Sequence, residues 1–204
     1  HGSALFADGL VMPQSRASME VARAVDPQPG ERILDLCAAP GAKTTQLAAL
    51  SGGVGEVVAV ERHPGRAQEL RRTCAAMGAS SVEVVVGDAR EFVAAAPFDR
   101  ALVDPPCSGL GTLQSRPDLR WRAQPSSIAE LAALQGEILE AGAAALAPGG
   151  VLVYSVCTIC RAEGEGVIDT FLEAHPQFTQ LDRRQLLPHR DGTDGFFIAR
   201  LQSA

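Results

Sequence analysis

The chain has 204 residues, of which 46% are hydrophobic, 4% are aromatic and 21% are charged, and its net charge at pH 7 is −6. This composition is typical of one globular domain and excludes a disordered or fibrous chain. No apolar run reaches the ~18–20 residues that a membrane span needs, and the acidic charge argues against a uniformly basic surface that coats nucleic acid.

Residues 1–3 (His-Gly-Ser) resemble a remnant of an expression vector. We therefore expect the domain to span residues 4–204 and to be a fragment of a longer protein. No basic region followed by an apolar core opens the chain, so we expect no signal peptide. Five cysteines are an odd number in a chain too large to need disulfides, which favours a reducing compartment and predicts a cytoplasmic location.

Apolar runs alternate with segments of helical period along the chain. In order, we expect a helix over 12–25, a break at 26–30, a strand at 32–36, a helix over 42–50, a strand at 56–60, a helix over 64–77, a strand at 82–86, a short helix over 90–95 and a strand at 98–103. There follow a long loop rich in Pro, Gly and Arg at 104–125, a helix from 126 or 127 to 146, a strand at 150–155, a helix over 162–174, and one or two strands near Phe178 and across 195–201. Nearly continuous Val, Ile and Leu strands separated by single helices predict a doubly wound α/β domain with a parallel sheet.

Small and acidic residues follow the first three expected strands, at the edge where parallel sheets bind ligands. Residues 35–43 turn from strand to helix through small side chains, which lets a ligand approach the backbone closely. Glu61 ends the second strand, where it can accept hydrogen bonds from ribose hydroxyls, and Asp88 follows the third. A tight turn or a helix cap would explain each feature alone, but together they favour a nucleoside ligand. The GxxxxGK[ST] pattern of P-loop NTPases is absent, because position 37 is Cys.

Two cysteines follow the fourth and fifth expected strands, Cys107 within 104–109 and Cys157 within 154–158. If these strands are neighbours, both thiols reach the same edge of the sheet, near polar groups and helix termini that can lower the pKa of a thiol. The alternative, a small buried hydrophobe, suits Cys74 within its helix.

Cys157 and Cys160 also form a C-x-x-C pattern, which occurs in zinc and redox sites. A zinc site needs four ligands, and a second closely spaced Cys/His pair is missing. A redox pair normally opens a helix in a thioredoxin-like chain, whereas this one follows a late strand. We therefore expect no metal, and the role of Cys160 stays open.

Three motifs carry a resemblance to a known family: DLCAAPGAKT at 35–44, DPPCSG at 104–109 and YSVCT at 154–158. In this order and spacing they resemble the Sun-type RNA (cytosine-5)-methyltransferases, such as the catalytic domain of the bacterial 16S rRNA enzymes, over nearly the whole chain. Amino-methyltransferases of nucleic acids carry a DPPY-like motif and lack the second cysteine. The chain departs from the family pattern at Ala42, usually Gly, and at Val156, usually Thr. The resemblance implies a Rossmann-like class I methyltransferase fold with a mostly parallel seven-stranded sheet.

The resemblance also implies S-adenosylmethionine as the cofactor. Glu61 would bind its ribose hydroxyls, Asp88 would lie near its adenine amino group, and Asp104 would lie beside it. The methionine end would be held by the backbone of Cys37, Ala38, Ala39, Pro40, Gly41, Ala42 and Lys43.

By the same resemblance, Cys157 matches the family's nucleophile, Cys107 the cysteine that assists product release, and Asp104 the acid that contacts the target cytosine. Carbon 5 of cytosine is a poor nucleophile, and addition of a thiolate to carbon 6 makes an enamine-like adduct whose carbon 5 can accept a methyl group. Asp104 would protonate or hydrogen-bond ring N3, and Cys107 would assist removal of the proton from carbon 5. An unpaired or flipped cytosine is therefore expected.

Ribosomal RNA is the expected partner, with transfer RNA as the alternative, and we expect a monomer without a membrane or metal partner. RNA contact is expected either from the long loop or from later arginines, and a solvated surface is the alternative for both. These residues are Arg116, Arg120, Trp121 and Arg122, and Arg183, Arg184 and Arg190. A catalytically retired RNA-binding or assembly module remains a competing hypothesis, which the two cysteines and the acids at the strand ends argue against. A small-molecule methyltransferase would not need the arginine-bearing loop.

Overall fold

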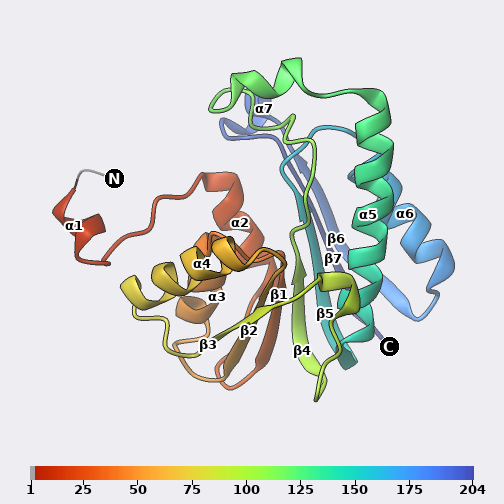
Figure 1. Ribbon diagram of the computed structural model, residues 1–204. Coiled ribbons are helices and arrows are strands. Elements are labelled where there is room, and N and C mark those ends of the chain that lie inside the picture. The colour runs from red at the N-terminus through yellow and green to blue at the C-terminus, as the bar shows by residue number, and fades with distance from the viewer. Residues whose placement is uncertain (1–2) are drawn as a thin grey trace.

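A computed structural model describes residues 3–204, so His1 and Gly2 of the expected vector remnant lie outside the described residues. Seven strands form one sheet, and helices pack on both of its faces (Figure 1). The strands are β1 (Arg32–Leu36), β2 (Glu56–Glu61), β3 (Val82–Val86), β4 (Phe98–Val103), β5 (Leu146–Val156), β6 (Phe178–Leu186) and β7 (Phe196–Ser203). The helices are α1 (Ala4–Ala7), α2 (Arg16–Val25), α3 (Ala42–Leu50), α4 (Pro64–Ala76), α5 (Pro125–Ala144), α6 (Glu165–Ala174) and α7 (Pro188–Asp191), with the short 3₁₀ helices η1 (Ala89–Glu91) and η2 (Pro117–Trp121).

The strand order is β3-β2-β1-β4-β5-β7-β6. The first five strands in this order are parallel, and β7 runs antiparallel to both β5 and β6. The predicted fold class is therefore confirmed, and the expected tail strands form an antiparallel pair. The direction of winding reverses between β1 and β4, and in open sheets ligands bind at the carboxyl ends of the strands around such a point.

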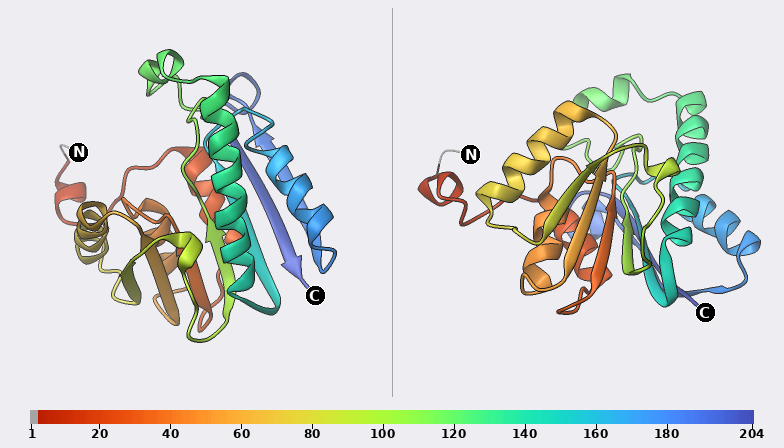
Figure 2. Two further views of the ribbon diagram at one scale, coloured as in Figure 1. Left: turned by 45° about the vertical axis from the view of Figure 1, so that its right-hand side comes forward. Right: turned by 60° about the horizontal axis from the view of Figure 1, so that its bottom comes forward.

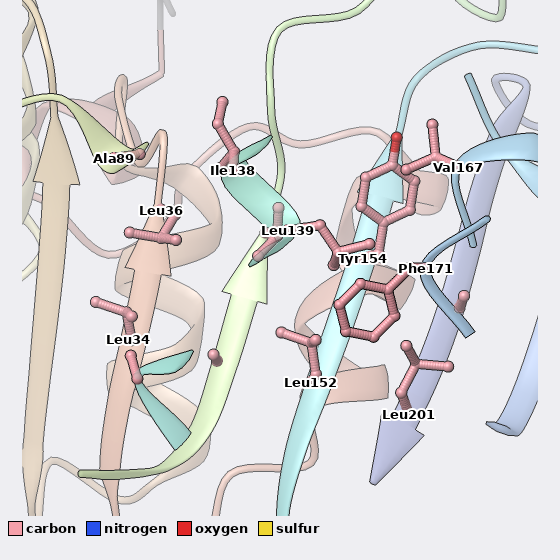
Figure 3. Close-up of a cluster of buried hydrophobic side chains, with 14 of the residues drawn as sticks. Leu34, Leu36, Ala89, Ile138, Leu139, Leu152, Tyr154, Val167, Phe171 and Leu201 are labelled. Atoms are coloured by element: carbon pink, nitrogen blue, oxygen red, sulfur yellow. The ribbon is translucent and has the colours of Figure 1, made fainter. Parts of the chain in front are cut away.

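Alternation along the strands divides the core between the two faces of the sheet. Leu34 and Leu36 of β1 pack with Ile138 and Leu139 of α5, on the face that α6 also covers (Figure 3). Ile33, which precedes Leu34, packs on the opposite face with the apolar side chains of α2 and α3. Helix α4 packs beside α3 on that second face, and Figure 2 shows the two helical layers from further directions.

Several local predictions differ from the structure, among them the starts of α2, β5 and α6, which were expected at residues 12, 150 and 162. The helix expected over 90–95 is wrong: only η1 forms, because Asp88 accepts from the backbone N–H of Arg90 and the chain then extends so that Phe92 packs near Phe98. The loop at 104–125 contains η2, and the helix expected to reach residue 146 ends at Ala144, because β5 begins at Leu146. None of the helices within residues 3–204 is both long and apolar enough to cross a membrane.

Candidate active site

The turn after β1 brings the backbone of residues 37–43 to the carboxyl edge of the sheet. Cys37 has a φ of 66°, and Gly41, which precedes α3, has a φ of 109°. A Cβ atom at Gly41 would lie 2.7 Å from a methyl carbon of Leu70, so glycine serves both the conformation and the packing at this position. The small side chains therefore leave this stretch of backbone open to a ligand at the start of α3.

A pocket beside this turn contains a buried carboxylate with a free acceptor. Glu61, at the end of β2, is 2% exposed, and its Oε1 accepts from the backbone N–H of His63 at 2.9 Å. Its Oε2 has no hydrogen-bond partner among the described residues, and a guanidinium nitrogen of Arg66 lies 3.5 Å away. Because an unsatisfied buried oxygen is costly, its presence in a pocket indicates a ligand that donates a hydrogen bond there. Among the residues that line this pocket are Cys37, Glu61, His63, Asp88, Pro106 and Leu134.

Asp88 reaches the same pocket from the end of β3. Its carboxylate binds the Arg90 guanidinium, with oxygen–nitrogen distances of 3.0 and 2.7 Å, and this interaction lowers the pKa of Asp88 to about 2. The carboxylate is therefore ionised at neutral pH. The structure thus brings Cys37, Glu61 and Asp88 together from three consecutive parallel strands.

A second hollow, which shares Cys37 with the first, contains an ion pair between Lys43 and Asp104. The Lys43 Nζ lies 2.7 Å from Asp104 Oδ2, and the Ser155 hydroxyl donates to Asp104 Oδ1 at 2.6 Å. Burial disfavours the ammonium, but the Asp104 carboxylate outweighs it and raises the pKa of Lys43. The Lys43 side chain therefore forms an ion pair with Asp104. The sequence motif did not indicate this interaction.

Asp35 lies under this hollow, with 1% of its surface exposed. The Thr44 hydroxyl donates to its Oδ2 at 2.6 Å. Burial raises the pKa of Asp35 to about 7, against the opposing effect of the Thr44 hydrogen bond. Sequence reasoning treated Asp35 only as the first residue of a motif, since nothing in the sequence distinguishes a buried carboxylate from one that caps a turn.

The sulfurs of Cys107 and Cys157 lie 3.2 Å apart, and both residues are free cysteines that are partly exposed. Their loops are adjacent because β4 and β5 pair in parallel, with Val103 beside Tyr154. The sequence prediction made this contact conditional on that pairing, which the structure shows.

The two thiols have opposite tendencies to ionise. A hydrogen bond from Cys107 lowers the pKa of Cys157; burial and the Asp104 carboxylate oppose this effect, while the Lys43 and Arg116 cations support it. The same contact with Cys157, together with burial, raises the pKa of Cys107. The arrangement therefore favours a thiolate at Cys157 that accepts a hydrogen bond from the Cys107 thiol.

Of the other three cysteines, Cys37 and Cys74 are poor nucleophiles and Cys160 lies outside the pair of sulfurs. Burial raises the pKa of Cys37 to about 12 and that of Cys74 to about 11. Cys160 is partly exposed, and its backbone N–H donates to the Thr158 hydroxyl at 3.1 Å. No group of three or more His, Cys, Asp or Glu side chains in the described part of the chain could hold a metal ion.

Two glycines fix the backbone around Cys157. The Gly111 N–H donates to the Cys157 carbonyl at 3.0 Å, and the Gly195 N–H donates to the Gly111 carbonyl at 2.8 Å. A Cβ atom at Gly111 would lie 1.8 Å from the Gly195 carbonyl oxygen, so this close approach requires glycine. The loops after β4 and β5 and the one before β7 are thereby joined at the site.

Sequence reasoning missed a buried polar cluster directly behind the two cysteines. Glu163 and Gln135 are both completely buried there, and Gln135 donates to the Glu163 carboxylate. Glu163 also accepts hydrogen bonds from Ser108 and Thr158, the residues that follow the cysteines. Glu163 stands in the polar segment Arg161–Glu165, and nothing in the sequence separates it from a solvated loop residue.

The arginine-bearing loop projects from the same edge of the sheet, with η2 at the top of Figure 1. Trp121 is 81% exposed, and the Arg120 guanidinium lies over its ring at 5.3 Å from the centroid. Arg122 pairs with Asp118, whereas neither Arg116 nor Arg120 forms an ion pair within residues 3–204. The later arginines of the sequence prediction, Arg183, Arg184 and Arg190, all pair with carboxylates.

Comparison with known proteins matches residues 22–202 to the family described as 16S rRNA methyltransferase RsmB/F. The probable ribosomal RNA small subunit methyltransferase B of Synechocystis sp. is 41% identical over 98% of this chain and 49% of its own length. NSun6 from Pyrococcus horikoshii, solved with SFG, has a TM-score of 0.91 and 30% identity over 99% of this chain and 55% of its own. The protein PH0851 has a TM-score of 0.94 and 36% identity over 98% of this chain and 49% of its own. The chain thus spans about half the length of the curated relatives it matches.

Proposed function

The chain belongs to the family of 16S rRNA methyltransferases RsmB/F, and from this premise we propose that it transfers a methyl group from S-adenosylmethionine to carbon 5 of a cytosine in ribosomal RNA. The observation that carries the proposal is the 3.2 Å contact between Cys107 and Cys157, beside a pocket that contains an unsatisfied buried carboxylate oxygen. A methyltransferase that acts on an amino group would need neither thiol, because an amine can attack the methyl group directly.

The residues present fit S-adenosylmethionine. Glu61 Oε2 is a buried acceptor without a hydrogen-bond partner in the described part of the chain, as a ribose hydroxyl requires, and Asp88 lines the same pocket. The backbone of residues 37–43 approaches from the other side, where small side chains leave space for the methionine end. When bound, the cofactor supplies the methyl group on an electrophilic sulfonium sulfur.

Cys157 acts as the nucleophile. Its thiolate adds to carbon 6 of the cytosine, which breaks the 5,6 double bond and makes carbon 5 nucleophilic toward the methyl group. Loss of the proton from carbon 5 then restores the double bond and expels Cys157 as a thiolate. The Cys107 hydrogen bond favours the thiolate both at the start and at the end of this cycle.

Asp104 and Lys43 act on the ring of the cytosine. Addition at carbon 6 places negative charge on the ring, and a hydrogen bond or proton at N3 stabilises it. The Lys43 ammonium donates a hydrogen bond to the Asp104 carboxylate at 2.7 Å, so the pair can supply a hydrogen bond or a proton to the base. A water molecule accepts the carbon-5 proton, and Cys107, which its raised pKa keeps as a thiol, donates a hydrogen bond to the departing Cys157 sulfur.

RNA is held by the loop that contains η2. Arg116 and Arg120 carry charges without carboxylate partners in the described chain, and Trp121 offers an exposed ring on which an unpaired base can stack. The acidic net charge of −6 keeps such binding local rather than spread over the surface.

Mass spectrometry of nucleosides tests the proposal. The full-length protein is incubated with unmodified 16S rRNA and isotopically labelled S-adenosylmethionine, and the RNA is digested to nucleosides. We expect labelled 5-methylcytidine. Label in N4-methylcytidine, in another nucleoside or in none would overturn the proposal. If a transfer RNA transcript is labelled and 16S rRNA is not, transfer RNA replaces ribosomal RNA as the substrate.

A further inference from the structure

Glu163, in the loop between β5 and α6, is a completely buried carboxylate with every acceptor site engaged. Its Oε1 accepts from the Ser108 backbone N–H at 2.8 Å and from Gln135 Nε2 at 3.0 Å. Its Oε2 accepts from the Ser108 hydroxyl at 2.5 Å and from the Thr158 hydroxyl at 3.3 Å. A buried carboxylate is tolerated only with such compensation, so this cluster is a specific arrangement rather than a loose polar pocket.

The donors to Glu163 come from both cysteine-bearing loops. Ser108 directly follows Cys107, Thr158 directly follows Cys157, and their hydroxyl oxygens lie 2.9 Å apart. The cluster thus joins, on the buried side, the same two loops whose sulfurs meet on the exposed side.

Two further side chains fix the cluster to the rest of the domain. Gln135 of α5 also donates to the Pro106 carbonyl at 2.9 Å, so the backbone is held on both sides of Cys107. The Tyr154 hydroxyl lies 2.6 Å from the Glu163 carbonyl and 3.1 Å from Gln135 Oε1. Figure 3 shows Tyr154 on β5, extending between α5 and α6.

We propose that Glu163 is a positioning residue, which holds the Cys107 and Cys157 loops in the one arrangement in which the two sulfurs touch. It acts through Ser108 and Thr158, since its own carboxylate is sealed from solvent and lines neither pocket at the strand ends. The inference rests on the proposed function for its catalytic meaning, but the geometry that it explains is a property of the free protein.

By holding the two loops, the cluster also acts on the reactivity of Cys157. The hydrogen bond from Cys107 is the largest influence that lowers the pKa of Cys157, and it depends on a sulfur–sulfur distance that the two loops set. The other charged groups that act on Cys157 are Asp104, Lys43 and Arg116, none of which bonds to Glu163. Loss of the Glu163 hydrogen bonds should therefore raise the pKa of Cys157 toward that of an ordinary thiol, while those three charged groups stay in place.

The test measures alkylation of Cys157 by iodoacetamide as a function of pH in the full-length protein, without RNA or cofactor, by mass spectrometry of the Cys157 peptide. We expect Glu163→Gln to slow alkylation at pH 7 by about 10-fold or more, since one unit of pKa changes the thiolate fraction about tenfold. The variant Cys107→Ala, which lacks the donor, gives the reference for full loss. The matched control is Glu165→Gln, two residues away, whose Oε2 has no hydrogen-bond partner among the described residues.

Ser108→Ala keeps the test decisive if Glu163→Gln does not fold. It removes the hydroxyl bond to Glu163 and the contact with Thr158 but keeps the Ser108 N–H bond, so we expect a smaller slowing in the same direction. Alkylation profiles of Glu163→Gln or, failing that, of Ser108→Ala that coincide with the wild type would overturn the inference. Absence of 5-methylcytidine with the wild-type protein would instead overturn the proposed function, so the two failures are distinguishable.

Discussion

The Cys107 and Cys157 sulfurs meet at 3.2 Å although 50 positions separate them in the chain. Parallel pairing of β4 with β5 brings their loops together, and the contact shifts the pKa values of the two thiols in opposite directions. One cysteine is thereby suited to attack and the other to donate a proton.

Replacing the nucleophile should stop chemistry and spare cofactor binding. We expect Cys157→Ala to lower the rate of methyl transfer by a factor on the order of 10⁴ or more, as removal of a covalent nucleophile does elsewhere. Affinity for S-adenosylmethionine should stay unchanged, because Cys157 lines neither pocket at the strand ends. Methyl transfer assays and isothermal titration measure the two effects, and substantial remaining turnover would reject the assignment.

Removing the free acceptor oxygen of Glu61 should weaken binding of the cofactor. Glu61→Ala is expected to raise the Kd for S-adenosylmethionine by roughly 10-fold to 100-fold, since a hydrogen bond to a charged group contributes ~1.5–3 kcal/mol. Glu56→Ala, at the opposite end of β2, is the control and should bind as the wild type does. Thermal unfolding shows whether the Glu61 variant stays folded, and an unaltered Kd would place the ribose elsewhere.

The buried carboxyl of Asp35 should make stability depend on pH. Burial raises its pKa from 3.8 to about 7, so the folded chain keeps a proton that the unfolded chain releases over this interval. This contribution to stability is full below the unfolded pKa and is lost as the pH rises through the folded value. Asp35→Asn keeps an oxygen for the Thr44 hydroxyl but does not titrate.

We therefore expect the free energy of unfolding of Asp35→Asn, relative to the wild type, to increase between pH 4 and about pH 7. Urea unfolding at a series of pH values measures this difference, and Asp169→Asn at an exposed position of α6 serves as the control. A difference that stays constant across the series would show that Asp35 is ionised when folded.

The loop that contains η2 should bind RNA through charge and stacking. Arg120→Gln is expected to reduce the slope of log affinity against log salt concentration by about 0.7–0.9, the share of one phosphate contact. Trp121→Ala should weaken binding at every salt concentration, because one stacked base contributes ~1–3 kcal/mol. Fluorescence anisotropy with a cytosine-containing RNA measures both, with Arg23→Gln on α2 as the control. A wild-type slope for Arg120→Gln together with a wild-type affinity for Trp121→Ala would leave the loop without this role.

Much of the fold was predictable because strand and helix patterns are local. The runs at 32–36, 82–86 and 98–103 form strands with the predicted bounds. The contact of Cys107 with Cys157 was predicted on the condition that β4 and β5 are neighbours, and they are. The helix expected over 90–95 failed because tertiary packing of Phe92 outweighed a weak local preference.

The interior of the site was less predictable than its edge. Glu163 receives hydrogen bonds from residues 28 and 55 positions away, and no local pattern encodes such a cluster. The ion pair of Lys43 with Asp104 likewise spans 61 positions. Sequence motifs identify which side chains lie at the ligand site. Long-range contacts decide which of these side chains are ionised, which are fixed by hydrogen bonds and which have no partner.

The most direct test of the two-cysteine account uses the variant Cys107→Ala with 16S rRNA and S-adenosylmethionine. If Cys157 forms the bond to cytosine and Cys107 assists its release, a protein–RNA adduct accumulates that survives a denaturing gel, and tandem mass spectrometry locates the nucleotide on Cys157. The double variant that also carries Cys157→Ala should form none. An adduct on another residue, or one that persists in the double variant, would contradict the account.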